Sequence, residues 1–400
     1  MHQNEAIAAE KAFIVQTYVR PGTVFVRGEG VHLYDTVGKR YLDMMAGIAV
    51  TALGHSDEPW ASAVAEQART LTHVSNLFYT EPQGRLARRL VEHSFADRVF
   101  FCNSGSEANE TALKFARKYA RTTTGRGDKI KFVAFSGGFH GRTMGALSVT
   151  AREKYRTPFE PLIPGVQFAP FNDLDAAGDA IDDTTCAVIV EPLQGEGGVN
   201  VATLEFLSGL RDLCDRAGAL LIFDEVQCGL GRTGALWASE SYGVAPDLMS
   251  VAKPLAGGLP IGVTLMRREV AEVMNPGDHG STFAGGPLIC RAAEVVFDRV
   301  NQSAMLESVR QKGDYLLQAL RRLESPLVQE VRGKGLLIGV ALTCDVRPLL
   351  HAARERGLLV INAGENVLRL CPPLIIETEH LEEAVSILGD CLATLEESGA

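Results

Sequence analysis

The chain has no apolar run that approaches the roughly 20 residues needed to span a bilayer. It also lacks a secretory signal, because its first residues, MHQNEAIAAEKAF, contain two acidic side chains and no apolar segment. Basic side chains are outnumbered, with 39 Lys and Arg against 49 Asp and Glu and a formal net charge of −10. Nucleic-acid binding needs clustered basic residues. These absences predict a cytoplasmic protein that binds neither membrane nor nucleic acid.

Sequence patterns for metal ligands and disulfides are also missing. None of the eight cysteines forms a C-x-x-C pair, and some lie inside apolar runs such as residues 186–190. The nine histidines show no H-E-x-x-H or similar spacing. The G-x-S-x-G elbow of many hydrolases is absent as well. We therefore expect buried, reduced cysteines and no metal site.

What the chain does contain is an ordinary globular composition, with 46% hydrophobic and 22% charged residues over 400 positions. Apolar runs at 99–102, 131–135, 187–190, 219–223 and 261–266 predict strands, and the spacing at 107–121 and 204–217 predicts helices. Continuous apolar strands separated by helices indicate an α/β fold with a mainly parallel central sheet covered by helices.

The two ends of the chain have a different pattern. Residues 24–44 alternate like short antiparallel strands, and residues 330–400 resemble a smaller α+β unit after two long helical stretches around 288–324. We expect an N-terminal arm with part of a small domain at 1–60, a large domain at 61–295 and a C-terminal small domain at 296–400.

Three features of the middle of the chain could carry chemistry. Asp224 ends a buried strand, at the edge where open α/β sheets bind ligands, although a capping or salt-bridged aspartate would look the same. Lys253 lies among apolar residues and glycines, where desolvation would make its amine a Schiff-base candidate, although a lone lysine of this kind is more often a surface residue and gains weight only beside Asp224. Residues 103–109, Asn-Ser-Gly-Ser-Glu-Ala-Asn, follow a strand and open a helix, which suits either a phosphate or a simple helix cap.

One glycine motif does not indicate a nicotinamide site. Residues 229–234 read G-x-G-x-x-G, but the polar residues 224–228 separate them from the preceding strand. The dinucleotide fingerprint needs its glycines directly after a strand and an acidic residue about 20 positions later. We therefore expect no dinucleotide here.

The phosphate cradle, the strand-end aspartate and the glycine-flanked lysine together resemble fold-type I pyridoxal-phosphate enzymes, and among them the class III aminotransferases. The resemblance runs almost from end to end. Its motifs include residues 26–30, 38–43, 46–50, 53–55, 75–79, 103–109, 138–143, 191–198, 223–227, 252–254, 279–283 and 368–370. Each motif alone is weak, but their order and spacing are specific.

The resemblance implies a role for each residue that would hold pyridoxal 5′-phosphate. Lys253 is expected to bind the cofactor covalently and to move the substrate proton, and Asp224 to pair with the ring nitrogen. The remaining cofactor contacts that it implies are Gly105 and Ser106 at the phosphate, Phe139 and Val226 on the two ring faces, Glu225 and Gln227 near the ring, and Thr282 at the cofactor of a neighbouring subunit. Thr282 thereby implies a homodimer with shared active sites.

The resemblance also implies two modes of substrate recognition. Arg142 would hold a carboxylate of the acylated substrate, and Arg369 would take the α-carboxylate of glutamate. Glu196 would pair with Arg369 and mask its charge when an ω-amino substrate is bound, and Ser281 would line the substrate site. The implied reaction converts N-acetylornithine and 2-oxoglutarate into N-acetylglutamate 5-semialdehyde and glutamate, in arginine biosynthesis.

The chain departs from the family pattern at two places. Residues 284–286 read Ala-Gly-Gly where the family commonly has Gly-Gly-Asn. By the same resemblance, ornithine aminotransferases have a tyrosine near the substrate carboxylate at the position of Ile48. The absence of that hydroxyl group favours an acylated ornithine over free ornithine.

Several alternative functions stay open at this point. They are transamination of succinylornithine, acyl-diaminopimelate, a carrier-linked lysine precursor, ornithine or 4-aminobutyrate. An aminomutase or racemase would not need the Glu196 and Arg369 pair, and a non-catalytic regulator would not need both Arg142 and Arg369.

Overall fold

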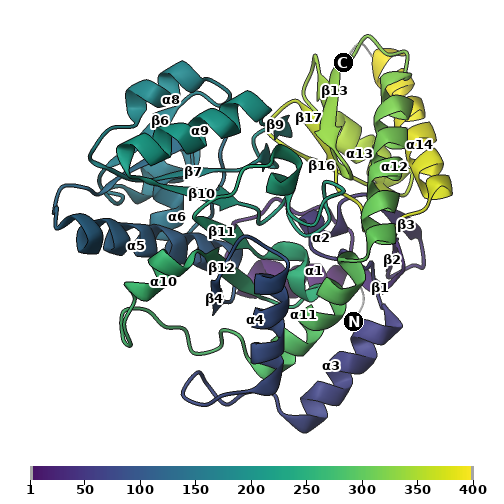
Figure 1. Cartoon of the computed structure of the whole chain (residues 1–400). Helices are drawn as coiled ribbons and strands as arrows, with labels where there is room; N and C mark the ends of the chain where they lie inside the picture. Colours follow the sequence, from purple (N-terminus) through teal and green to yellow (C-terminus); the bar gives the residue numbers. More distant parts are fainter. Residues whose placement is uncertain (1–2, 398–400) are drawn as a thin grey trace.

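A seven-stranded sheet forms the centre of the molecule (Figure 1). The computed structural model describes residues 3–397. The strands lie in the order β4 (Arg98–Cys102), β12 (Gly262–Met266), β11 (Leu248–Val251), β10 (Leu220–Asp224), β7 (Thr185–Val190), β5 (Lys131–Phe135) and β6 (Val166–Ala169). Only β12 runs antiparallel to its neighbours. The predicted mainly parallel sheet is thus confirmed.

Helices cover this sheet, as the continuous apolar strands require. They include α5 (Gly105–Thr124), α6 (Met144–Ser148), α8 (Leu174–Ala180), α9 (Leu204–Ala217) and α10 (Arg268–Glu272) (Figure 1). The side chains of Ser104 and Thr203 cap α5 and α9 by accepting backbone N–H groups. Both helices end at a glycine with positive φ, Gly125 at 68° and Gly218 at 60°. Local sequence therefore fixes where both helices begin and end.

Two smaller sheets come from the chain ends. The first has the order β1 (Phe25–Glu29), β2 (His32–Asp35), β3 (Arg40–Asp43) and β15 (Leu358–Leu359), and the second β13 (Val328–Lys334), β14 (Leu337–Leu342), β17 (Val367–Leu370) and β16 (Ile361–Asn362). Because β15 pairs with β3, C-terminal residues complete the N-terminal sheet. Near these sheets lie α12 (Ser303–Arg321), α13 (Arg347–Glu355) and α14 (Thr378–Glu397) (Figure 1).

The remaining elements are short or lie at one side of the main sheet. Helix α11 (Pro287–Val300) packs on α3 (Glu58–Thr70) and α4 (Glu81–Glu92). The others are α1 (Gln3–Phe13), α2 (Ala46–Ala49), α7 (Glu153–Arg156), η1 (Thr157–Phe159), η2 (Ala238–Tyr242), η3 (Lys253–Ala256), β8 (Leu193–Gln194) and β9 (Asn200–Val201).

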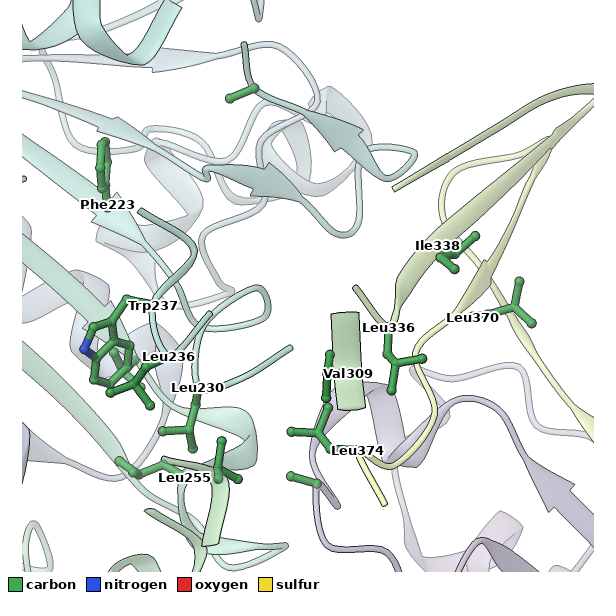
Figure 2. Packing of buried hydrophobic residues seen from close by; sticks show 14 of the residues in the cluster. Phe223, Leu230, Leu236, Trp237, Leu255, Val309, Leu336, Ile338, Leu370 and Leu374 are labelled. Atoms are coloured by element: carbon green, nitrogen blue, oxygen red, sulfur yellow. The ribbon is translucent and has the colours of Figure 1, made fainter. Parts of the chain in front are cut away.

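One apolar core joins the main sheet to the C-terminal strands. Figure 2 shows Phe223 and Trp237 on the side of the main sheet, and Leu336, Ile338 and Leu370 on the side of the C-terminal strands. All five belong to the same buried cluster. Because burial of such side chains contributes on the order of 1.5–3 kcal/mol each, the two parts of the fold stabilise one another.

The predicted bounds of helices and strands agree best with the structure in segments that have a clear apolar pattern. The helix at 204–217 and the strand at 131–135 have the predicted bounds, whereas β6 and β11 were not predicted. Among the cysteines, seven are buried free thiols and Cys344 is partly exposed. No helix within residues 3–397 is long and apolar enough to cross a membrane.

Candidate active site

A cavity of about 330 Å³ lies at the carboxyl ends of the parallel strands. Its wall includes one residue that closely follows or ends each of β4, β5, β7, β10 and β11, namely Asn103, Phe139, Glu191, Asp224 and Lys253. Small-molecule sites have volumes of about 300–1,000 Å³ and occur at this edge of open α/β sheets. The fold therefore places the predicted Asp224 and Lys253 in one cavity.

Asp224 is buried and held by three donors. Its Oδ2 accepts hydrogen bonds from Nδ1 of His140 and from Nδ2 of Asn109, both at 2.8 Å, and its Oδ1 accepts from the backbone N–H of Val226 at 3.0 Å. An ionised carboxylate has about four lone-pair positions, so one is left for a donor from a ligand. A protonated ring nitrogen fits that requirement.

His140 and Asn109 are site residues that the sequence analysis did not single out. Burial acts to lower the pKa of His140, but the hydrogen bond and charge of Asp224 outweigh it, and the net direction is upward. Both residues lie in motifs quoted above, and their only sequence signal is a polar side chain among small and apolar neighbours. His140 and Asn109 lie 84 and 115 positions from Asp224 in the sequence, so only the fold brings them into contact with it.

Lys253 begins the short helix η3, with a φ of 21° that an L-residue rarely adopts. Desolvation by burial lowers the pKa of its ammonium group, Glu196 acts against this shift and Arg369 reinforces it. A lower pKa increases the fraction of neutral amine, which is the form that acts as a nucleophile or base. The position predicted from the flanking glycines is thus also chemically suitable.

The amino end of α5 forms an anion cradle at the cavity. Ser104, Gly105 and Ser106 line it, and the first N–H groups of a helix are free to bind a phosphate. A Cβ at Gly105 would lie only 2.6 Å from Cγ1 of Val226, so only glycine allows this close approach. Together with the Phe139 and Val226 side chains in the wall, the cradle fits a phosphorylated planar ring such as pyridoxal phosphate.

Glu196, Gln227 and Arg369 form a connected polar group beside Lys253. The buried Nη1 of Arg369 donates to Oε1 of Glu196 at 2.6 Å and to Oε1 of Gln227 at 2.8 Å. Gln227 in turn donates from Nε2 to Glu196 at 3.1 Å. Nε and Nη2 of Arg369 have no hydrogen-bond partner among residues 3–397. A fully buried guanidinium with two unused donors suits a carboxylate ligand.

Besides Arg369, four predicted residues, all within the described part of the chain, are absent from the wall of this cavity. Arg142 is exposed, and its guanidinium lies 3.6 Å from the ring centroid of Tyr155. Ser281 accepts a hydrogen bond from Asn103 at 2.9 Å, and the adjacent Thr282 is exposed.

Glu225 is the fourth of these residues, and its side chain binds the start of η2 instead of lining the cavity. Its carboxylate accepts the backbone N–H groups of Ala238 at 2.6 Å and Ser239 at 2.8 Å, at the start of η2. Burial raises the pKa of Glu225 to about 7. Successive side chains of an extended segment point to opposite sides, which explains why Asp224 and Glu225 have different surroundings.

Comparisons with known proteins agree with this geometry. Residues 15–392 match the family model described as aminotransferase class-III. A mitochondrial acetylornithine aminotransferase of Alnus glutinosa is 54% identical, over 99% of this chain and 89% of the relative. A succinylornithine transaminase of Salmonella typhimurium is 50% identical, over 78% of this chain and 76% of the relative.

The solved structures include close matches over the whole fold. An ornithine aminotransferase of Toxoplasma gondii, whose structure has partial occupancy of pyridoxal phosphate, matches with a TM-score of 0.96. It is 32% identical, and the match covers 99% of this chain and 95% of that one.

Proposed function

The chain belongs to the class III aminotransferases and is a pyridoxal-phosphate enzyme, and from this premise we propose that it transfers the amino group of N-acetylornithine to 2-oxoglutarate. The products would be N-acetylglutamate 5-semialdehyde and glutamate, in arginine biosynthesis. The observation that carries the proposal is the Glu196–Arg369 pair beside Lys253. It suits an enzyme that must accept two substrates of different charge at one position.

We assign the cofactor contacts to the residues that line the cavity. Pyridoxal phosphate, when bound, supplies an electron sink that stabilises negative charge at the substrate carbon. Asp224 would hold a proton at the ring nitrogen through its unused lone pair, and Gly105 and Ser106 would bind the phosphate. Phe139 and Val226 would pack on the two ring faces, and Gln227 would lie near the ring hydroxyl. Glu225 would contribute only by fixing η2 behind Asp224.

Lys253 would hold the cofactor and then act as the proton carrier. Because burial lowers the pKa of its ammonium group, Nζ is more readily neutral and able to take a proton from the substrate carbon. The protonated Nζ of Lys253 can then donate that proton to the cofactor. Nearby Glu196 stabilises the charged form of the amine.

The two arginines would bind carboxylates in different parts of the site. With an acylated ornithine bound, Arg142 would hold its carboxylate, while Glu196 stays on Arg369 and neutralises it. With glutamate bound, Glu196 would move away, and Arg369 would bind the α-carboxylate with its free donors. Ser281 would stay near the substrate through its contact with Asn103.

The exposed apolar residues support the proposed homodimer. Leu77, Phe78 and Phe283 are exposed by 86%, 68% and 68%, in two segments joined by the hydrogen bond from Asn76 to the carbonyl of Ala284. Thr282 is exposed and directly precedes Phe283. Contiguous exposed apolar surface marks interfaces, so a second copy of the chain would bring Thr282 toward the partner's cofactor.

The second candidate is the same reaction with succinylornithine, because a succinylornithine transaminase is 50% identical to this chain. Both candidates use the same site residues. They differ only in the acyl group, and the higher identity and coverage of the acetylornithine aminotransferase relative favour the acetyl group.

A half-reaction tests the proposal. The purified holoenzyme, without a keto acid, is mixed with N-acetylornithine, succinylornithine, ornithine or 4-aminobutyrate, and the visible absorbance of the lysine-bound cofactor is followed. We expect the highest kcat/KM with N-acetylornithine. A higher value for another amine would reassign the substrate, and no visible absorbance with added cofactor would contradict the role of Lys253.

A further inference from the structure

The segment that carries Glu196 has an unusual set of contacts to its backbone. In the turn between β8 and β9, each of the four carbonyl groups of residues 195–198 accepts a side-chain hydrogen bond. The donors are Arg369 to Gly195, Arg152 to Glu196, Asn200 to Gly197 and Arg332 to Gly198. Three of the four donors are arginines, and they come from distant parts of the chain.

Arg332 makes the best-defined of these contacts from outside the cavity. Its Nε and Nη2 both donate to the Gly198 carbonyl, at 3.0 and 2.7 Å. The side chain is 23% exposed and starts from β13, in the C-terminal part of the fold. It therefore ties the turn of the two-stranded sheet β8–β9 to the C-terminal sheet that also carries Arg369.

The turn needs such contacts because its glycine-rich sequence does not make its backbone rigid. Three of its four residues are glycine, and Gly198 has a φ of 120°. Glycine loses more conformational freedom on folding than other residues, so a glycine turn is not rigid by itself. A Cβ at Gly197 would lie 2.3 Å from the Gly137 carbonyl oxygen, so a stiffer residue does not fit there.

We propose that Arg332 and Arg152 are positioning residues that clamp the backbone of residues 195–198, so that only the Glu196 side chain moves between the two substrates. The inference rests on the proposed exchange of Glu196 on Arg369. With the backbone fixed by hydrogen bonds to charged donors, the carboxylate returns to the same place after each half-reaction. The clamp thereby determines substrate selectivity without touching substrate.

The clamp predicts an asymmetric effect on the two half-reactions. If the turn loosens, Glu196 covers Arg369 less often, and the uncovered charge disfavours the acylated ornithine. Glutamate needs Arg369 uncovered, so its half-reaction is retained or improved. A purely structural role would reduce both half-reactions together.

The test uses the holoenzyme with Arg332→Met, Arg332→Lys and the matched control Arg321→Met. Arg321 also donates from Nε and Nη2 to one carbonyl, that of Val331, but it does not contact residues 195–198. The kcat/KM values for N-acetylornithine and glutamate are measured in separate half-reactions. Hydrogen exchange of the peptide that contains residues 195–198 is measured with and without cofactor.

For Arg332→Met we expect the ratio of kcat/KM for N-acetylornithine to that for glutamate to fall about tenfold or more, near the lower end of the loss expected when a charged hydrogen bond is removed. We also expect faster exchange at 195–198, a partial effect in Arg332→Lys, and neither effect in Arg321→Met. An unchanged ratio, or unchanged exchange at 195–198, would overturn the clamp. If the wild-type enzyme does not react with N-acetylornithine, the proposed substrate is wrong, and the clamp is then judged by exchange and by the amine that does react.

Discussion

Nδ1 of His140 lies 2.8 Å from Oδ2 of Asp224, and both side chains are buried. The imidazole, which also lines the cavity, thus fixes the carboxylate and, when protonated, adds a positive charge beside it. Asn109 donates to the same oxygen. These two donors fix the orientation of the Asp224 carboxylate.

Removing the imidazole should weaken the enzyme without abolishing it. In His140→Gln we expect kcat to fall about tenfold and the dissociation constant of pyridoxal phosphate to rise, because Asp224 keeps Asn109 but loses a charged donor. Steady-state kinetics and fluorescence titration of the cofactor measure both quantities. The control is His351→Gln, an exposed histidine on α13. Wild-type cofactor affinity in His140→Gln would show that Asp224 does not need the imidazole.

Replacing the candidate proton carrier should have the largest effect. Lys253→Ala is expected to lower turnover by at least about a thousandfold, because the variant loses both the covalent anchor and the base. Borohydride reduction of the holoenzyme followed by peptide mapping should label the peptide of residue 253 only in the wild type. Lys131→Ala is the control, since Lys131 pairs with Asp182 at the surface. Turnover that survives in Lys253→Ala would refute the assignment.

The stability contributed by Glu196 should depend on pH. Burial acts to raise the pKa of Glu196, but Arg369 and Lys253 outweigh it and lower the pKa to about 2. The unfolded value is about 4.3, so ionised Glu196 contributes stability that is complete above that pH and is lost as the pH falls toward 2. The difference in free energy of unfolding between wild type and Glu196→Gln should be constant above about pH 5 and narrow below about pH 4.3. Urea unfolding at a series of pH values measures it, and a difference that is constant down to the lowest accessible pH would contradict the pairing.

The residue at position 48 should influence the choice between acylated and free ornithine. Ile48 lies in a left-handed turn, with φ of 68°, two residues before Val50, which lines the cavity. A β-branched residue is especially disfavoured there, so Ile48→Tyr adds no backbone strain. We expect Ile48→Tyr to raise kcat/KM for ornithine relative to N-acetylornithine, because it supplies a hydroxyl near the substrate carboxylate. The matched variant Ile48→Phe has the ring alone, and an unchanged ratio in Ile48→Tyr would refute the prediction.

The domain boundaries, the roles of the site residues, the homodimer and the cytoplasmic location all stay predictions. The domain boundaries after residues 60 and 295 are untested, although β15 of the C-terminal part does complete the N-terminal sheet. The cytoplasmic location is also open, since the Alnus glutinosa relative is mitochondrial.

The sequence by itself determined the local elements and the chemical type of the site. Long periodic segments such as α9 specify their own bounds, because the cap at Thr203 and the glycine at 218 act within a few residues. Asp224 and Lys253 could be found because a carboxylate at the end of an apolar strand and an amine among glycines are costly without a function. The ordered motifs supplied the family.

Only the tertiary structure decided which residues that are distant in the sequence contact the groups of the site. Packing between elements decides the antiparallel direction of β12 and the contact of His140 with Asp224. It also decides that Glu225 binds the start of η2 and does not line the cavity. The hydrogen bond from Arg332 to the Gly198 carbonyl joins residues 134 positions apart. Such contacts have no local signal, because the free energy that selects them comes from burial and hydrogen bonding across the whole fold.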